Sequence, residues 1–272
     1  MRASHTPLAG LAFAFALGCS APIAAASESW DAIRASVFGS KPIHDGHGVV
    51  TLDAPGRPED MRVVPIAAKA GFSDGRTIKT VTFLIDENPT PVVAEFKMGP
   101  GRDAANLAID FRVDRQSDAR VVVEASDGEL YMVSRLIKYA GGQSSCSAPP
   151  TGDPAEIVAN MGKMTLTSAH PGADQAASPT RPMAELRMRH PNHTGMVMDQ
   201  ITLLYTPLKM VSEITVAQAG EPVFTATGSI ALSQDPLIKF DYPRNAANEM
   251  TVTFKDTDGG AWTRTFPLGP ES

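Results

Sequence analysis

One cysteine is the clearest candidate for chemistry in this 272-residue chain. Cys146 lies in the run Ala140-Gly-Gly-Gln-Ser-Ser-Cys-Ser-Ala-Pro-Pro150, whereas the other cysteine, Cys19, lies in an apolar N-terminal stretch. A single thiol cannot form a disulfide within its own chain, so it pairs with another molecule, reacts, or is incidental. Because Gly, Ser and Pro are typical of flexible surface segments, the sequence predicts an exposed thiol, which is the setting that a reactive cysteine needs.

The first 26 residues predict an export signal. Arg2 gives a positive start, residues 8–17 are apolar, and Ala24-Ala25-Ala26 offers small residues for cleavage before Ser27. The apolar stretch is too short to cross a membrane, and no later stretch is longer. We therefore expect a soluble periplasmic protein, in an oxidising compartment. Leu17-Gly18-Cys19 is a weaker, lipoprotein-like cleavage site, at which Cys19 would be acylated.

Charge and motifs exclude several classes of function. The chain has 24 Lys and Arg against 30 Asp and Glu, a formal net charge of −6, and nucleic-acid binding needs clustered basic residues instead. Gly-x-Gly-x-x-Gly and the phosphate loop are absent from the sequence. We therefore expect neither an enzyme nor a cofactor.

Short segments rich in β-branched residues dominate the rest of the chain, several of them alternating apolar with polar residues. The predicted strands cover residues 49–52, 61–66, 78–85, 92–98, 106–113, 121–125 and 130–137, and then 201–205, 210–216, 222–228, 237–242, 250–255 and 261–266. Between Gly142 and Arg181 the periodicity stops, except for a possible short helix at 154–164. This pattern favours an all-β fold of two immunoglobulin-like antiparallel β-sandwich domains joined by a flexible linker.

Several motifs resemble the SoxYZ proteins of bacterial sulfur oxidation. The segments similar to SoxY are Ser29 to Ile43, Leu52-Asp-Ala-Pro55, Glu87-Asn-Pro-Thr-Pro91 and the Gly141-Gly142 pair before Cys146. Residues 188–268, which open with His190-Pro191 and Gly195, are similar to SoxZ. The order Y then Z in one exported chain resembles the fused carriers associated with quinoprotein alcohol dehydrogenases.

The resemblance implies a role for each part of the chain. In SoxYZ carriers a cysteine on a Gly-rich arm holds sulfur intermediates covalently while separate enzymes act on them. Cys146 would then be the carrier thiol and Gly141 and Gly142 its hinge, with pairing between the Y and Z parts. The implied partners are periplasmic sulfur-oxidation enzymes, or a quinoprotein dehydrogenase and its cytochrome. Two departures are that Gln143-Ser144-Ser145 separate the glycines from the cysteine and that a second domain follows the arm.

The same resemblance divides the chain into parts. We expect a signal peptide at 1–26, a SoxY-like sandwich with its arm at 27–147, a linker at 148–180 and a SoxZ-like sandwich at 181–270.

Two other functions fit the sequence. The chain could be a non-covalent accessory module for a periplasmic PQQ-dependent dehydrogenase, in which Cys146 is dispensable. It could instead handle copper, because His190, His193, Met196 and Met198 supply imidazole and thioether ligands. Alternating methionines also suit a sandwich core and His-Pro suits a turn, and the spacing is unspecific, so we expect no metal site.

Overall fold

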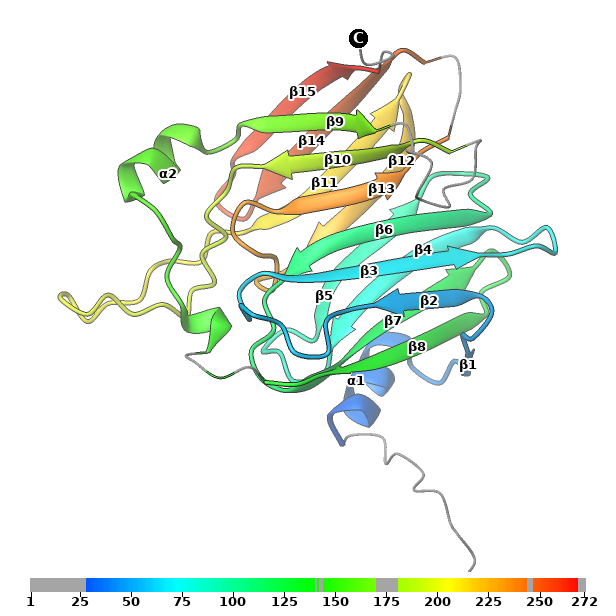
Figure 1. Cartoon of the computed structure of the whole chain (residues 1–272), viewed down its shortest axis with the longest axis horizontal. Helices are drawn as coiled ribbons and strands as arrows, with labels where there is room; N and C mark the ends of the chain where they lie inside the picture. Colours follow the sequence, from blue (N-terminus) through cyan, green and yellow to red (C-terminus); the bar gives the residue numbers. More distant parts are fainter. Residues whose placement is uncertain (1–27, 140, 142–143, 170–180, 244–246, 269–272) are drawn as a thin grey trace, which may run out of the picture.

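A computed structural model describes residues 28–139, 141, 144–169, 181–243 and 247–268 (Figure 1). The predicted signal peptide, with Cys19, and the predicted hinge residue Gly142 lie outside the described residues. In the part of the chain that is described, no helix has the length and apolar character needed to cross a membrane.

The described residues form two packed β-sheets, which confirms the all-β class. The nine-stranded sheet runs in the order β1 (Ile43–Asp45), β8 (Leu130–Ile137), β7 (Ser117–Ala125), β4 (Ile78–Ile85), β5 (Val92–Met98), β12 (Glu221–Gly228), β11 (Val211–Gln218), β14 (Glu249–Asp256) and β15 (Ala261–Pro267). The six-stranded sheet runs in the order β2 (Val50–Asp53), β3 (Val64–Gly71), β6 (Ala104–Phe111), β13 (Leu237–Asp241), β10 (Met183–Met188) and β9 (Met164–Ala169). Apart from the parallel pair β1–β8, these neighbours are antiparallel, and burial alternates along strands such as β6 because successive side chains point to opposite faces.

Both sheets continue from the N-terminal half, β1–β8, into the C-terminal half, β10–β15. In the nine-stranded sheet β5 pairs with β12, and in the six-stranded sheet β6 pairs with β13. The approach at the first joint is close: a Cβ on Gly99 would lie 1.9 Å from the carbonyl oxygen of Pro222. The expected pairing of the Y-like and Z-like parts is therefore made by backbone hydrogen bonds in two layers.

Aromatic side chains pack across the joint. The ring centroids of Phe83 and Phe96 are 5.8 Å apart, those of Phe96 and Phe224 5.3 Å, and those of Phe224 and Phe240 5.1 Å. All four rings are fully buried, in one hydrophobic cluster that draws on both halves. Because the halves share this core, we expect them to unfold together.

The structure corrects part of the predicted linker. The structure describes residues 148–169 of this segment. They form α2 (Pro154–Asn160) and then β9, which pairs with β10 along its whole length. The Asp153 carboxylate caps α2 by accepting hydrogen bonds from two backbone N–H groups of its first turn. The strand was overlooked because its partner lies beyond the linker.

Residues 201–205 were predicted as a strand, which is wrong: Tyr205 makes only an isolated bridge, with Met198.

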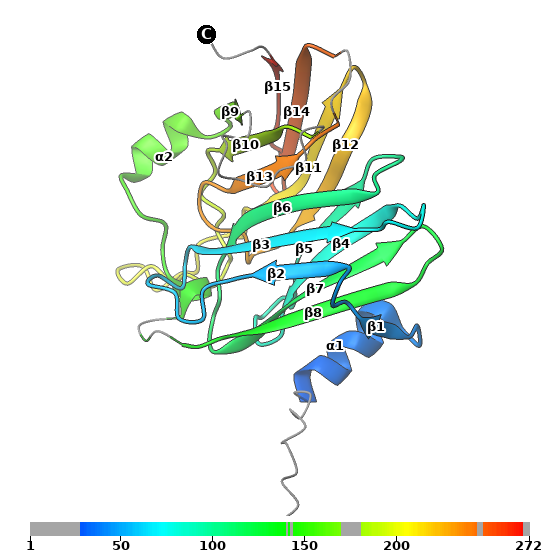
Figure 2. The same cartoon turned by 45° about the vertical axis from the view of Figure 1, so that its right-hand side comes forward.

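Helix α1 (Glu28–Phe38) covers the outer face of the nine-stranded sheet, at the bottom of Figure 2. Trp30 and Ile33 pack there in a separate small core with Leu84, Val122 and Leu130. These sheet residues alternate along β4 and β7 with residues of the main core, so the sheet is covered on both faces at this end.

Candidate functional site

Cys146 lies between the two halves, in the single 3₁₀ turn η1 (Ser145–Ser147). The thiol is free, and the residue has an exposed fraction of 0%. The predicted exposed thiol is therefore wrong for this structure. The small neighbours that suggested flexibility also let the backbone approach both halves closely, so they favour burial once partners are present. We call residues 144–150 the cysteine segment.

The N-terminal half holds the cysteine segment through Asp114, which follows β6 and is 7% exposed. Its carboxylate accepts hydrogen bonds from the backbone N–H of Cys146, at 3.2 Å, and from the Ser144 hydroxyl. Asn88 positions this region, because its side chain accepts from the Asp114 N–H at 2.9 Å and donates to the Arg112 carbonyl at 2.8 Å. Asn88 belongs to the Glu-Asn-Pro-Thr-Pro motif, so a segment that carries the resemblance to SoxY also shapes the site.

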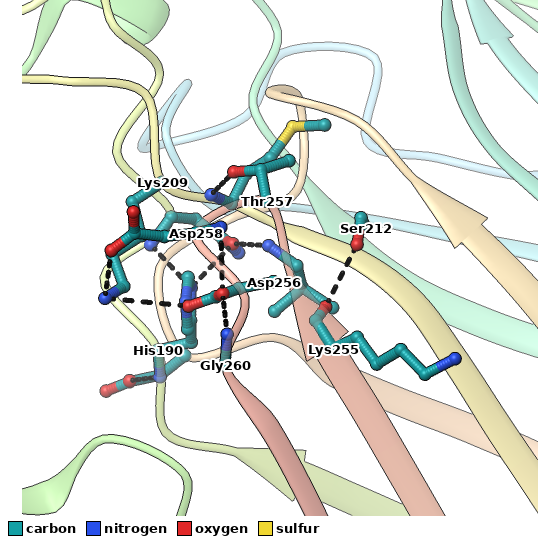
Figure 3. A network of polar contacts seen from close by, with 12 residues as sticks. His190, Lys209, Ser212, Lys255, Asp256, Thr257, Asp258 and Gly260 are labelled. Atoms are coloured by element: carbon teal, nitrogen blue, oxygen red, sulfur yellow. Dashed lines mark hydrogen bonds and ion pairs between the residues drawn. The ribbon is translucent and has the colours of Figure 1, made fainter.

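The C-terminal half holds the same segment through Thr194, whose hydroxyl donates to the Cys146 carbonyl at 2.6 Å. Thr194 lies in the turn that the His-Pro motif opens. His190 Nδ1 lies 3.1 Å from the Asn192 backbone nitrogen and 3.0 Å from the Asn192 side-chain oxygen, and Nε2 lies 3.3 Å from a carboxylate oxygen of Asp256 (Figure 3). The motif therefore builds a buried turn that presents Thr194 to the cysteine.

Asp256 anchors that turn to the hairpin β14–β15. Its carboxylate accepts from the backbone N–H groups of Gly260, at 2.6 Å, and Asp258, at 3.0 Å, and Lys209 lies 3.7 Å away (Figure 3). These backbone bonds and His190 lower the pKa of Asp256 although burial opposes them. The site is thus fixed by residues spread over the whole chain.

The setting of Cys146 suppresses its reactivity. Burial raises the pKa of the Cys146 thiol to about 11, and the negative charge of Asp114 adds to this effect. The Ser145 hydroxyl and the positive charge of Arg112 oppose it. Because the thiolate is the nucleophile, the docked cysteine is a poor one at neutral pH.

A cavity of about 830 Å³ lies beside the cysteine segment. Ser147, Pro149 and Pro150 form one wall, and the other walls come from α2 and from residues 191–209, which lie together at the left of Figure 1. The apolar side chains of residues 201–205 are strongly exposed next to it; Ile201, for example, is 92% exposed. This end of the molecule offers room and apolar surface near the thiol.

The structure does not bring the four residues considered for copper together. His193, Met196 and Met198 line the 830 Å³ cavity, whereas the His190 ring is buried against Asn192 and Asp256. Burial lowers the pKa of His193, and its Nδ1 is buried without a hydrogen-bond partner among the described residues. In that part of the chain no group of three or more His, Cys, Asp and Glu residues is arranged to hold a metal ion.

The predicted hinge is described in part. Gly141 has a φ of +94°, a conformation that favours glycine, whereas Gly142 is outside the described residues. A hinge role for these two residues stays a prediction.

Acid is expected to weaken the fold through His190. Burial lowers the pKa of this ring below its ordinary value of 6.5, so below about pH 6.5 the unfolded chain takes up a proton that the folded chain refuses. The free energy of unfolding should fall in this range. Asp256, whose pKa is lowered in the folded state, adds its own loss only as the pH approaches its ordinary value of 3.8 and below. Urea midpoints at pH 7.5, 6.0 and 5.0 measure the slope.

The control for this measurement is His190→Gln, which removes the titrating ring. The variant should be less stable at pH 7.5 but lose less further stability between pH 6.5 and 5. Parallel pH dependences for the two proteins would contradict the assignment to His190.

Two family models match the chain in sequence order. Sulfur oxidation protein SoxY matches residues 34–143, and sulphur oxidation protein SoxZ matches residues 173–267. The SoxY match ends at residue 143, so it stops short of Cys146. No curated protein matches the chain.

Similarity to solved structures is weak. Superoxide reductase (neelaredoxin) from Ignicoccus hospitalis aligns at 9% identity and a TM-score of 0.29, covering 34% of this chain and 79% of that one. A beta-glycosidase from Bacteroides vulgatus aligns at 10% identity and a TM-score of 0.19, covering 85% of this chain and 25% of that one. TM-scores this low carry no argument. The two family matches and their order show that the chain is a fused SoxYZ-like protein, of the carrier type found in sulfur oxidation.

Proposed function

We propose that this protein is exported to the periplasm and carries sulfur intermediates covalently on Cys146, which rests in a docked position between its two halves. The single observation that supports this most directly is the place of the thiol. It is the only cysteine outside the predicted signal peptide, and it lies where the SoxY-like and SoxZ-like halves meet, hydrogen-bonded to both.

Loading requires the cysteine segment to leave its docked position. Three hydrogen bonds described above hold it, from Ser144 and Cys146 to Asp114 and from Thr194 to Cys146. At about 0.5–1.5 kcal/mol net for the neutral bond and about 1.5–3 kcal/mol for each bond to the Asp114 carboxylate, they stabilise the docked form by several kcal/mol, so the undocked form is a minor species at equilibrium. Once exposed, the thiolate can attack the S–S bond of a donor and expel the donor's other sulfur, without a cofactor.

The partners proposed are periplasmic enzymes of the sulfur-oxidation type. More specifically, we propose a quinoprotein dehydrogenase and its cytochrome as the partners, because the Y-like part precedes the Z-like part in one chain. Export rests on the N-terminal sequence.

A second candidate is a non-covalent accessory module for a PQQ-dependent dehydrogenase. The buried, weakly acidic thiol favours it, as does the exposed apolar stretch at 201–205. In this case Cys146 would serve packing only.

Intact-mass analysis of the protein isolated from its native periplasm tests the proposal. A fraction of the wild-type protein should carry a sulfur-containing adduct that maps to Cys146, and Cys146→Ser should carry none. A matched Ser145→Ala variant, next to the cysteine, should keep the adduct. If the wild-type thiol is always unmodified while a dehydrogenase co-purifies equally with Cys146→Ser, the accessory function replaces the carrier.

Weakening the docked position should speed labelling of the thiol. Thr194→Val removes the hydroxyl that donates to the Cys146 carbonyl, so iodoacetamide labelling at pH 7.5 should rise about fivefold, which corresponds to one lost hydrogen bond. Asp114→Asn should have a larger effect, because it also removes the negative charge that raises the thiol pKa.

Thr253→Val is the matched control for this labelling, because Thr253 pairs with Thr263 on β14–β15 and has no contact with the cysteine segment. Labelling rates of Thr194→Val and Asp114→Asn equal to that of the control would show that these bonds do not hold the segment.

A further inference from the structure

Arg112 is a buried cation without an acidic partner. The other two arginines buried to the same degree are paired, Arg102 with Asp241 at 2.8 Å and Arg120 with Asp86 at 2.7 Å. Arg112 is 3% exposed and forms no ion pair within the described residues. Its Nη1 donates instead to the Leu232 carbonyl at 2.5 Å and the Ile230 carbonyl at 3.2 Å. An unpaired buried guanidinium is costly, and a negative charge that enters the site in another state would offset this cost.

The neighbourhood of Arg112 identifies where that charge would lie. Arg112 lines a cavity of about 160 Å³ together with Ala148 and Pro149, which follow Cys146 in the cysteine segment. Burial lowers the pKa of Arg112 to about 10, and the electrostatic interaction with Cys146 opposes this shift. The positive charge of Arg112 in turn favours the Cys146 thiolate. Asp60 and Asp235 also line this cavity, but each is paired with another arginine, Asp60 with Arg62 at 2.7 Å and Asp235 with Arg189 at 2.5 Å.

We propose that Arg112 is the internal counter-ion for negative charge on Cys146, so that the docked position prefers an anionic adduct to a neutral one of similar size. This inference rests on the proposed function and adds to it a residue that determines which adducts stay docked. Guanidinium groups bind oxyanions through paired N–H donors, so a terminal sulfonate is the group that Arg112 suits best. Asp114 acts in the opposite sense and keeps the unloaded cysteine in its neutral thiol form.

Two small adducts that differ in charge test this proposal. With tetrathionate, the Cys146 thiolate attacks an inner sulfur, forms Cys–S–S–SO₃⁻ and expels thiosulfate. With methyl methanethiosulfonate, it forms Cys–S–S–CH₃ and expels methanesulfinate. Dithiothreitol returns the thiol from either adduct, releasing thiosulfate or methanethiol and becoming a cyclic disulfide, and intact mass follows the rate of loss.

Arg112→Gln should speed loss of the anionic adduct at least about tenfold and change loss of the methyl adduct less than twofold, because only the anionic adduct loses a charge-assisted contact. Arg112→Lys, which keeps the charge, should restore most of the protection. Arg62→Gln is the matched control: Arg62 lines the same cavity but is already paired with Asp60 at 2.7 Å, so both rates should stay within twofold of wild type.

Equal acceleration of both adducts by Arg112→Gln would overturn the proposal, because it would show only a loosened fold. If Arg112→Gln does not fold, the thermal stability of the two adducts of the wild-type protein tests the proposal instead. Its Tm should be higher with the anionic adduct than with the methyl adduct, and the reverse order would overturn the assignment. An unmodified Cys146 in native material would contradict the carrier function but not the role of Arg112, because the two adducts are made in vitro.

Discussion

Cys146 in the native protein is expected to react with iodoacetamide at pH 7.5 at least about a hundredfold more slowly than in the same chain unfolded in urea. The docked site raises the thiol pKa from 9.0 to about 11, which lowers the thiolate fraction at this pH by about two orders of magnitude. The exposed fraction of 0% hinders the reagent as well. Mass mapping of the Cys146 peptide at timed intervals measures both rates.

The pH dependence separates two routes to the labelled protein. If the thiol reacts where it is docked, the rate should keep rising towards pH 11, because Asp114 and burial outweigh Arg112 and Ser145. If it reacts only after undocking and undocking limits the rate, the rate should level off with pH and become independent of the iodoacetamide concentration. A native rate within tenfold of the unfolded rate would contradict the docked site altogether.

Phe224→Ala is expected to lower the free energy of unfolding by about 3–5 kcal/mol, the usual cost of removing a fully buried phenylalanine ring. Phe224 is on β12 and contacts Phe96 of the N-terminal half as well as Phe240 of its own half. The cavity left behind would therefore lie in the joint, and both halves should lose stability together.

The two tryptophans report on the halves separately, since Trp30 lies on α1 and Trp262 on β15. In urea titrations of Trp30→Phe and Trp262→Phe backgrounds, Phe224→Ala should shift both fluorescence midpoints by a similar amount. Phe38→Ala is the matched control, because this partly buried ring packs against α1 residues outside the joint and should cost less. A shift confined to the Trp262 signal would show that the halves unfold independently.

The strands that the sequence predicted best are those with a clear pattern of their own. Residues 78–85, 92–98 and 130–137 are strands with those bounds, and the Asp127-Gly128 turn connects β7 to β8. Such segments carry their local signal in β-branched residues and turn chemistry. By contrast, residues 183–188 were not predicted as a strand, although alternate residues of this segment are buried in β10. Its burial follows from pairing with β9 and β13, which local pattern does not encode.

Cys146 could be singled out because it is the one cysteine outside the predicted signal peptide, but its surroundings could not be predicted from the sequence. Asp114 and Thr194, which hold it, are 32 and 48 residues away in the chain, and nothing local links them. Asp114 and Arg112 lie in Asp110-Phe-Arg-Val-Asp114, where charges alternate with apolar residues, and this reads as an ordinary solvated strand end. The burial of both charged side chains is the signal that was missed, and it exists only once the two halves are paired.

Because the two halves belong to one chain, their strand pairing does not depend on protein concentration. A carrier made of two chains would separate as its concentration falls, and each part would then present long unpaired edges, here those of β5 and β6, open to aggregation. In one chain the partner is held at a high effective concentration whatever the amount of protein. The thiol's pocket, built from both halves, therefore persists in a sparse population of single molecules, with the two parts always present in equal number.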